Sequence, residues 1–183
     1  MDQVTLRNIC INNVILSPYF VSIVKLSDRN IYKYTLDKIG SYIICNICNC
    51  HWIVIQKKTS NAVNVFDSGG GILLPTKSRL SRICKKLLKF SGSINVHFDF
   101  NYGNPLQDLE SFTCAEHVLS YLLYELRYGK CRLGRYGNYL MKKCKMEQIS
   151  PDQYVWWLVY NKKQLAEKPD LLSVTNWYEE LLI

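Results

Sequence analysis

The stretch Gln107–Arg127, which reads QDLESFTCAEHVLSYLLYELR, contains the clearest helix start in the chain. Thr113 and Glu116 have the spacing of a capping box, so we expect Thr113 to be the N-cap and Cys114 the first helical residue. The apolar stripe that would bury this helix consists of Ala115, Val118, Leu119, Leu122, Leu123 and Leu126. Unpaired N–H groups and the positive end of the dipole at a helix N-terminus stabilise a thiolate, which makes Cys114 a candidate nucleophile.

Cysteine usage leaves a second interpretation of Cys114 open. The chain has eight cysteines, and a buried cysteine is most often a small hydrophobic residue. The first residues, MDQVTLRN, lack the basic flank and apolar segment of a secretory signal. We therefore expect a protein that is not secreted, with free thiols in a reducing compartment.

Composition predicts one globular domain over residues 1–183, since the chain is 48% hydrophobic and 21% charged. Apolar runs such as Ser41–Cys45 and Trp52–Ile55 are far shorter than the ~18 residues of a membrane span, so no membrane partner is expected. The formal net charge is +8, and no Asp or Glu occurs in residues 68–98 or 126–146. Such basic stretches favour an acidic partner, above all nucleic acid.

Five segments rich in β-branched and aromatic residues predict strands. These segments are Tyr19–Leu26, Ser41–Ile47, His51–Gln56, Ala62–Phe66 and Ser93–Phe100. The third and fourth are expected to form a hairpin around a turn at Lys57–Asn61. A short N-terminal helix is indicated loosely by Val4, Ile9, Ile11, Val14 and Ile15.

An amphipathic helix is predicted after Pro75. Its apolar face consists of Leu80, Ile83, Cys84, Leu87 and Leu88, and its basic face of Arg82, Lys85, Lys86 and Lys89. Three more helices are expected at about residues 136–147, 151–166 and 174–182. The fold class is therefore α+β, with a mixed or antiparallel sheet packed against helices and Cys114 at a buried helix N-terminus.

The groups that a cysteine nucleophile needs are all present. His51 begins one strand of the predicted hairpin and Asp67 directly follows the other, so strand pairing can bring base and carboxylate together. Gln107 lies seven residues before Cys114 and can aim its amide at the space that the Cys114 N–H faces, which would give an oxyanion hole. Glycines in the segment 68–71 allow backbone to pass close to another group.

These residues resemble those of a known family. The order of His51-Trp52, Val65-Phe66-Asp67, Gln107 and Cys114 resembles the adenovirus-type maturation protease, adenain, and its relatives in virophages and related DNA viruses. Ser17-Pro18-Tyr19-Phe20 is similar to that family's Gly-Pro-Tyr-Phe. The resemblance extends from about residue 17 to about residue 127.

The resemblance implies a single-domain α+β cysteine protease of the papain-like and adenain-like type. By position, His51 would be the base, Asp67 its orienting group, Cys114 the nucleophile and Gln107 the oxyanion donor. It further implies a monomeric endopeptidase that cleaves viral capsid and core precursor proteins at glycine-containing sites. Such an enzyme acts in the virion and in the interior of the infected cell, in cytoplasm or nucleus.

Cofactors in this family are regulatory, and none is needed for the chemistry. Viral DNA is one, and the resemblance suggests phosphate contacts from Arg82, Lys85, Lys86 and Lys89, with a solvated basic face as an equal alternative. An activating peptide is the other, tethered through a cysteine whose position here is near Val96, where no cysteine stands. A covalently bound peptide would instead need Cys84 or another surface thiol as its attachment point. Ala115 also replaces the family's usual glycine after the nucleophile.

Rival interpretations use the same residues. Cys45, Cys48, Cys50 and His51 could be read as a zinc site, but an extended segment would divide them between two faces, so no metal is expected. His117, one turn after Cys114, is expected to be a surface or core-edge histidine. Trp156-Trp157 are expected in the core.

Two other functional classes stay open. A deconjugating protease for ubiquitin-like proteins uses the same catalytic groups, although Thr113-Cys114-Ala115 and the seven-residue spacing from Gln107 favour the viral type. A non-enzymatic basic protein that binds nucleic acid in the virion would explain the charge of +8. That class would leave the arrangement of His51, Asp67 and Gln107 without a reason.

Overall fold

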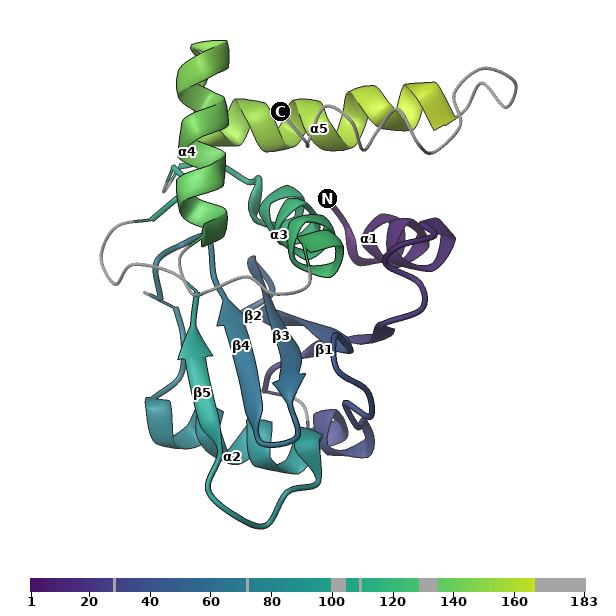
Figure 1. Cartoon of the computed structure of the whole chain (residues 1–183), viewed down its shortest axis with the longest axis vertical. Helices are drawn as coiled ribbons and strands as arrows, with labels where there is room; N and C mark the ends of the chain where they lie inside the picture. The colour runs from purple at the N-terminus through teal and green to yellow at the C-terminus, as the bar shows by residue number, and fades with distance from the viewer. Residues whose placement is uncertain (28, 72, 100–104, 109, 129–134, 167–183) are drawn as a thin grey trace.

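The computed structural model describes residues 1–27, 29–71, 73–99, 105–108, 110–128 and 135–166. In these residues a five-stranded sheet is packed between helices, which confirms the α+β class (Figure 1). The strands are β1 (Phe20–Lys25), β2 (Tyr42–Ile47), β3 (His51–Thr59), β4 (Ala62–Phe66) and β5 (Asn95–Phe98). They lie side by side in chain order. Strands β1 and β2 are parallel, as are β4 and β5, whereas β3 runs antiparallel to both β2 and β4. The sheet is therefore mixed.

Five α-helices and one short 3-10 helix accompany the sheet in the part of the chain that the structure describes. They are α1 (Gln3–Asn12), η1 (Arg29–Lys33), α2 (Lys77–Leu88), α3 (Cys114–Tyr128), α4 (Arg135–Glu147) and α5 (Pro151–Ala166). The starts and ends of α3, α4 and α5 agree with the sequence prediction to within a residue. The helix predicted at residues 174–182 lies outside the described residues.

Two apolar cores lie on opposite faces of the sheet. Tyr42 and Ile44 of β2 pack into the core shared with α1, α3, α4 and α5. Ile43 and Cys45, which alternate with them, pack into the core under α2 and η1. Burial on both faces is the reason why the inner strands read as nearly continuous apolar runs. Figure 1 shows α2 at the end of the molecule opposite α4 and α5.

The amphipathic pattern of α2 is confirmed. Its buried residues are Leu80, Ile83, Cys84, Leu87 and Leu88, as predicted. Lys89 ends the helix in the left-handed conformation, with φ of 48°. Because Cys84 is fully buried, it is not a surface thiol, and the suggestion that it could tether a peptide is wrong.

Two local predictions were wrong. Strand β3 runs on to Thr59 with a bulge at Lys58, so the hairpin turn is shorter than the predicted 57–61. Helix α1 buries Leu6 and Cys10, whereas Val4, Ile11 and Val14 of the predicted pattern are exposed.

The tryptophans of α5 also differ from expectation. Trp156 is 51% exposed and Trp157 is 42% exposed, while Val155 and Leu158 of the same helix enter the core. A helix turns about 100° per residue, so neighbouring apolar positions cannot all face inward. None of the described helices is both long and apolar enough to cross a membrane.

Candidate active site

The β3–β4 hairpin brings His51 and Asp67 together as predicted. His51 is the first residue of β3, and Asp67 directly follows β4. The antiparallel register, in which Val54 pairs with Phe66, places the start of one strand beside the end of the other. His51 Nε2 and Asp67 Oδ1 are 2.5 Å apart, and the residues are only 7% and 1% exposed. The two side chains form a buried imidazole–carboxylate pair.

Backbone N–H groups hold the carboxylate of Asp67. The N–H of Gly69 donates to Oδ1 (2.8 Å) and the N–H of Gly71 to Oδ2 (3.1 Å). A Cβ atom on Gly69 would lie 3.2 Å from Asp67 Oδ1 and 3.3 Å from His51 Cε1, so a side chain there would press on the pair. Gly71 has φ of 84°, which glycine adopts without strain. The predicted close approach of this segment therefore occurs at the His51–Asp67 pair.

His51 has partners on both sides of its ring. Since Asp67 occupies Nε2, the other ring nitrogen, Nδ1, is available to the thiol of Cys114. Burial lowers the pKa of His51, but hydrogen bonds to Asp67 and Cys114 and the charges of both groups outweigh it. The balance raises the pKa of His51 from 6.5 to about 9. The imidazole is therefore held in its protonated form near neutral pH.

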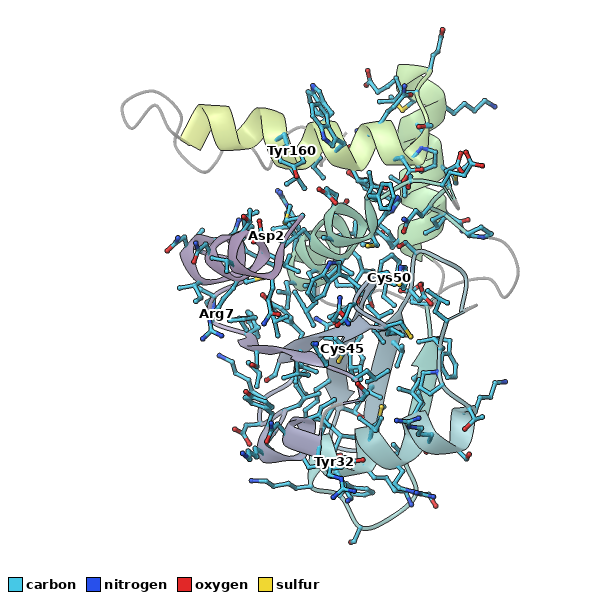
Figure 2. The ribbon with its side chains drawn as sticks, turned by 180° about the vertical axis from the view of Figure 1, so that it is seen from behind. Asp2, Arg7, Tyr32, Cys45, Cys50 and Tyr160 are labelled. Carbon is cyan, nitrogen blue, oxygen red and sulfur yellow. The ribbon has the colours of Figure 1, made fainter. Side chains whose placement is uncertain are left out.

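Cys114 is the first residue of α3, where sequence reasoning placed it, and it is 5% exposed. The first helical hydrogen bond runs from the N–H of His117 to the carbonyl of Thr113 (3.0 Å), so the N–H groups of the first turn have no partner within the helix. The Cys114 thiol also lies 3.9 Å from the carbonyl oxygen of Cys50, to which it donates. In Figure 2 Cys50, in the turn between β2 and β3, lies close to α3.

The side chains predicted to form a capping box are engaged elsewhere. The Thr113 hydroxyl donates to Asp152 of α5. Glu116 accepts from the Tyr160 hydroxyl (2.9 Å), which reaches α3 from α5 (Figure 2). The helix starts at the predicted residue, but its first turn is fixed by contacts with α5 that the local sequence does not reveal.

Gln107 lies on the segment that leads into α3 and is buried. The Ser68 hydroxyl donates to Gln107 Oε1 (2.8 Å), and Gln107 Nε2 donates to the carbonyl of Ser111 (2.8 Å). The N–H of Gln107 also donates to the Ser68 carbonyl (3.1 Å). These contacts fix which end of the amide carries the hydrogens, and they use one of the two N–H bonds of Nε2. The second N–H remains available for another acceptor.

Sequence reasoning missed Asp152, which connects several parts of the site. Its carboxylate accepts from the Asp108 N–H (2.8 Å), the Ser111 hydroxyl (3.0 Å), Thr113, and Nε2 of His117 (3.0 Å). Burial raises the pKa of Asp152, but the hydrogen bonds from His117, Thr113 and Asp108 prevail and lower it to about 2. His117 is fully buried, so of the two predicted positions, surface or core edge, the surface one is wrong.

A pocket of about 450 Å³ opens at Cys114. The residues that line it include the aromatic Trp52 and Phe112 and the polar Lys25, Asn46 and Cys50. The aromatic ring of Phe112, two residues before Cys114, is 88% exposed. An exposed apolar side chain at the rim of a pocket is suited to contact a ligand.

The cysteines before His51 do not lie on one extended segment. Cys48 and Asn49 have φ of 53° and 62° and form the tight turn between β2 and β3, so the prediction of an extended chain there was wrong. Cys48 and Cys50 are exposed, whereas Cys45 is buried in the core under α2. The seven cysteines of the described residues are free thiols.

The predicted DNA-contacting residues lie far from this pocket in the fold. Arg82, Lys85 and Lys86 belong to α2, and Lys89 ends it. That helix packs on the face of the sheet opposite α3. Lys86 lies over the ring of Tyr32 (4.0 Å to its centre), which Figure 2 shows at the end of the molecule away from α5.

Comparison with known proteins adds a distant structural likeness. No family model matches the sequence, and no curated protein matches it. Among solved structures, the chain is similar to the central domain of the uncharacterized Lpg1148 protein from Legionella pneumophila. The TM-score is 0.41 with 14% identity, over 64% of this chain and 73% of that chain. A likeness of this degree carries no argument about activity.

Proposed function

We propose that this protein is a viral cysteine endopeptidase of the adenain type that cleaves capsid and core precursor proteins during virion maturation. One observation carries the proposal. The Cys114 thiol, at the first position of a buried helix, hydrogen-bonds His51, whose other ring nitrogen lies 2.5 Å from Asp67. A buried histidine–carboxylate pair alone often serves structure; a thiol at a helix N-terminus beside it favours nucleophilic catalysis.

The proposed reaction uses four side chains. Cys114 and His51 act as a thiolate and imidazolium pair, the proton of the thiol residing on His51, and the thiolate attacks the carbonyl carbon of the scissile bond. The Cys114 N–H and the free N–H of Gln107 stabilise the oxyanion. The imidazolium of His51 then gives a proton to the leaving amine, while Asp67 holds the ring. Water that His51 deprotonates releases the acyl group and restores the thiol.

The pocket and the resemblance together suggest the substrate class. Trp52 and Phe112 beside Cys114 suit an extended peptide with an apolar residue near the cut. The resemblance to adenain adds a glycine pair, or a glycine two residues before the cut. We propose precursor proteins as partners, a monomeric enzyme, and action in the virion and infected-cell interior, in cytoplasm or nucleus.

Cleavage assays test the proposal. A fluorogenic peptide ending in Gly-Gly and purified viral precursors are offered to wild type, Cys114→Ala and His51→Ala, with and without DNA. We expect wild type to cleave and both variants to lose cleavage to background. Cleavage that survives Cys114→Ala would overturn the proposal. Preference for a ubiquitin-like precursor over capsid precursors would favour the deconjugating protease.

The exposed basic face of α2 supports a second candidate, a role for nucleic acid. In the α2 region Arg82, Lys86 and Lys89 are exposed, and no acidic residue occurs in residues 68–98. We propose viral DNA as a regulatory cofactor that binds this face, in place of or together with an activating peptide. A wild type that binds DNA tightly but cleaves nothing under any condition would instead favour the non-enzymatic packaging protein.

A further inference from the structure

Asp152 lies in the first turn of α5, and its carboxylate contacts two adjoining segments of the chain. The carboxylate accepts hydrogen bonds from the Asp108 N–H (2.8 Å) and the Ser111 hydroxyl (3.0 Å). Both donors belong to the segment that carries Gln107. Thr113 and His117, which also donate to the carboxylate, belong to the start of α3. The two segments hold the two donors that the proposed oxyanion hole needs.

A carboxylate in the first turn of a helix often serves its own helix, but here another group has that task. The N–H of Gln153 donates to the Ser150 hydroxyl (3.2 Å), and the N–H of Ser150 donates to Gln153 Oε1 (2.9 Å). These reciprocal bonds are a capping box for α5. The carboxylate of Asp152 therefore turns away from α5 toward α3.

The contacts continue from Asp152 to both donors. On one side, Asp152 holds the Ser111 hydroxyl, and the carbonyl of the same Ser111 accepts from Gln107 Nε2 at 2.8 Å. On the other side, Asp152 holds Thr113, the residue before Cys114, and His117, one turn further along α3. His117 is fully buried, which leaves this turn of α3 little freedom to shift.

We infer that Asp152 is a positioning residue that holds the Gln107 segment against the start of α3, so that the Gln107 amide and the Cys114 N–H face one oxyanion. This inference rests on the proposed peptidase function. An oxyanion hole works only when its donors are fixed before charge develops, because their reorganisation would otherwise add to the barrier. Asp152 supplies that fixation without touching the substrate.

The test compares Asp152→Ala and Asp152→Asn with a matched control, Ser150→Ala. The control removes the cap of the same helix and leaves the carboxylate of Asp152 in place. Each variant is measured in the full chain for kcat and KM on the fluorogenic Gly-Gly peptide, and for the rate of Cys114 alkylation by iodoacetamide. Alkylation needs the thiolate that His51 stabilises, but it forms no oxyanion.

We expect Asp152→Ala to lower kcat about 100-fold, the loss typical of a displaced oxyanion donor, with KM and the alkylation rate near wild type. Asp152→Asn keeps one acceptor oxygen, so its kcat should lie between those of Asp152→Ala and wild type. Ser150→Ala should lower the melting temperature but keep kcat. If Asp152→Ala does not fold, Ser111→Ala, which keeps the carbonyl that Gln107 contacts, should show a smaller loss of the same kind.

Three results would overturn the inference. Asp152→Ala, or Ser111→Ala in its place, could retain wild-type kcat. It could slow alkylation as much as hydrolysis, which would mean that Asp152 acts on the thiolate. Kcat could also fall in Ser150→Ala as in Asp152→Ala, which would mark a general loss of stability. A wild type that cleaves no peptide would instead remove the proposed function, and the inference with it.

Discussion

At the scale of single residues, His51 connects the charge of Asp67 to the thiol of Cys114, and both contacts raise the pKa of His51 to about 9. Asp67→Asn removes the charge but keeps a hydrogen-bond acceptor, so the pKa of His51 should fall. We expect the alkaline limb of the kcat/KM profile to lie near pH 9 in wild type and clearly lower in Asp67→Asn. An alkaline limb that stays in place in the variant would show that Asp67 does not set this pKa.

The raised pKa of His51 also predicts how the stability of the fold depends on pH. His51 has a higher pKa in the folded protein, about 9, than its ordinary 6.5, so it contributes stability that is complete below about pH 6.5. That contribution is lost as the pH rises through about 9. The difference in melting temperature between wild type and Asp67→Asn should therefore shrink between these two pH values. A constant difference would contradict the account.

At the scale of elements, the bulge at Lys58 links β3 to α3. The ammonium group of Lys58 pairs with the carboxylate of Glu125 in α3, and the Glu125 side chain is buried. Lys58→Met leaves a buried carboxylate without its partner and should destabilise the fold by about 3 kcal/mol in urea unfolding. The double variant Lys58→Met with Glu125→Leu should recover most of this loss. A double variant as unstable as Lys58→Met alone would show that the pair's charge is not the cause.

At the scale of the whole molecule, the sheet separates the basic face of α2 from the pocket at Cys114. Arg82→Gln with Lys85→Gln should weaken DNA binding and reduce the slope of log K against log salt by about 2, since two phosphate contacts are lost. Peptide cleavage without DNA should be unchanged. Unchanged DNA affinity and slope would mean that this face is only solvated.

How much of this could be read from the sequence depends on the range of the interactions. The start of α3 and the buried face of α2 follow from local patterns, and the His51–Asp67 pair follows from one hairpin. Asp152 could not be predicted, because it meets Thr113 from 39 residues away and nothing in its own helix marks it. The sequence shows His117 one turn after Cys114, but it does not show that this histidine is buried and paired with Asp152.

The alkylation of Cys114 tests the central claim most directly. Intact protein is treated with iodoacetamide at pH 6, and each cysteine is quantified by mass spectrometry, with the exposed Cys48 and Cys50 as internal controls. We predict that Cys114 reacts fastest although it is only 5% exposed, and that His51→Ala abolishes this advantage. If Cys48 and Cys50 react first in wild type, Cys114 is an ordinary buried thiol and the active site proposed for this protein is wrong.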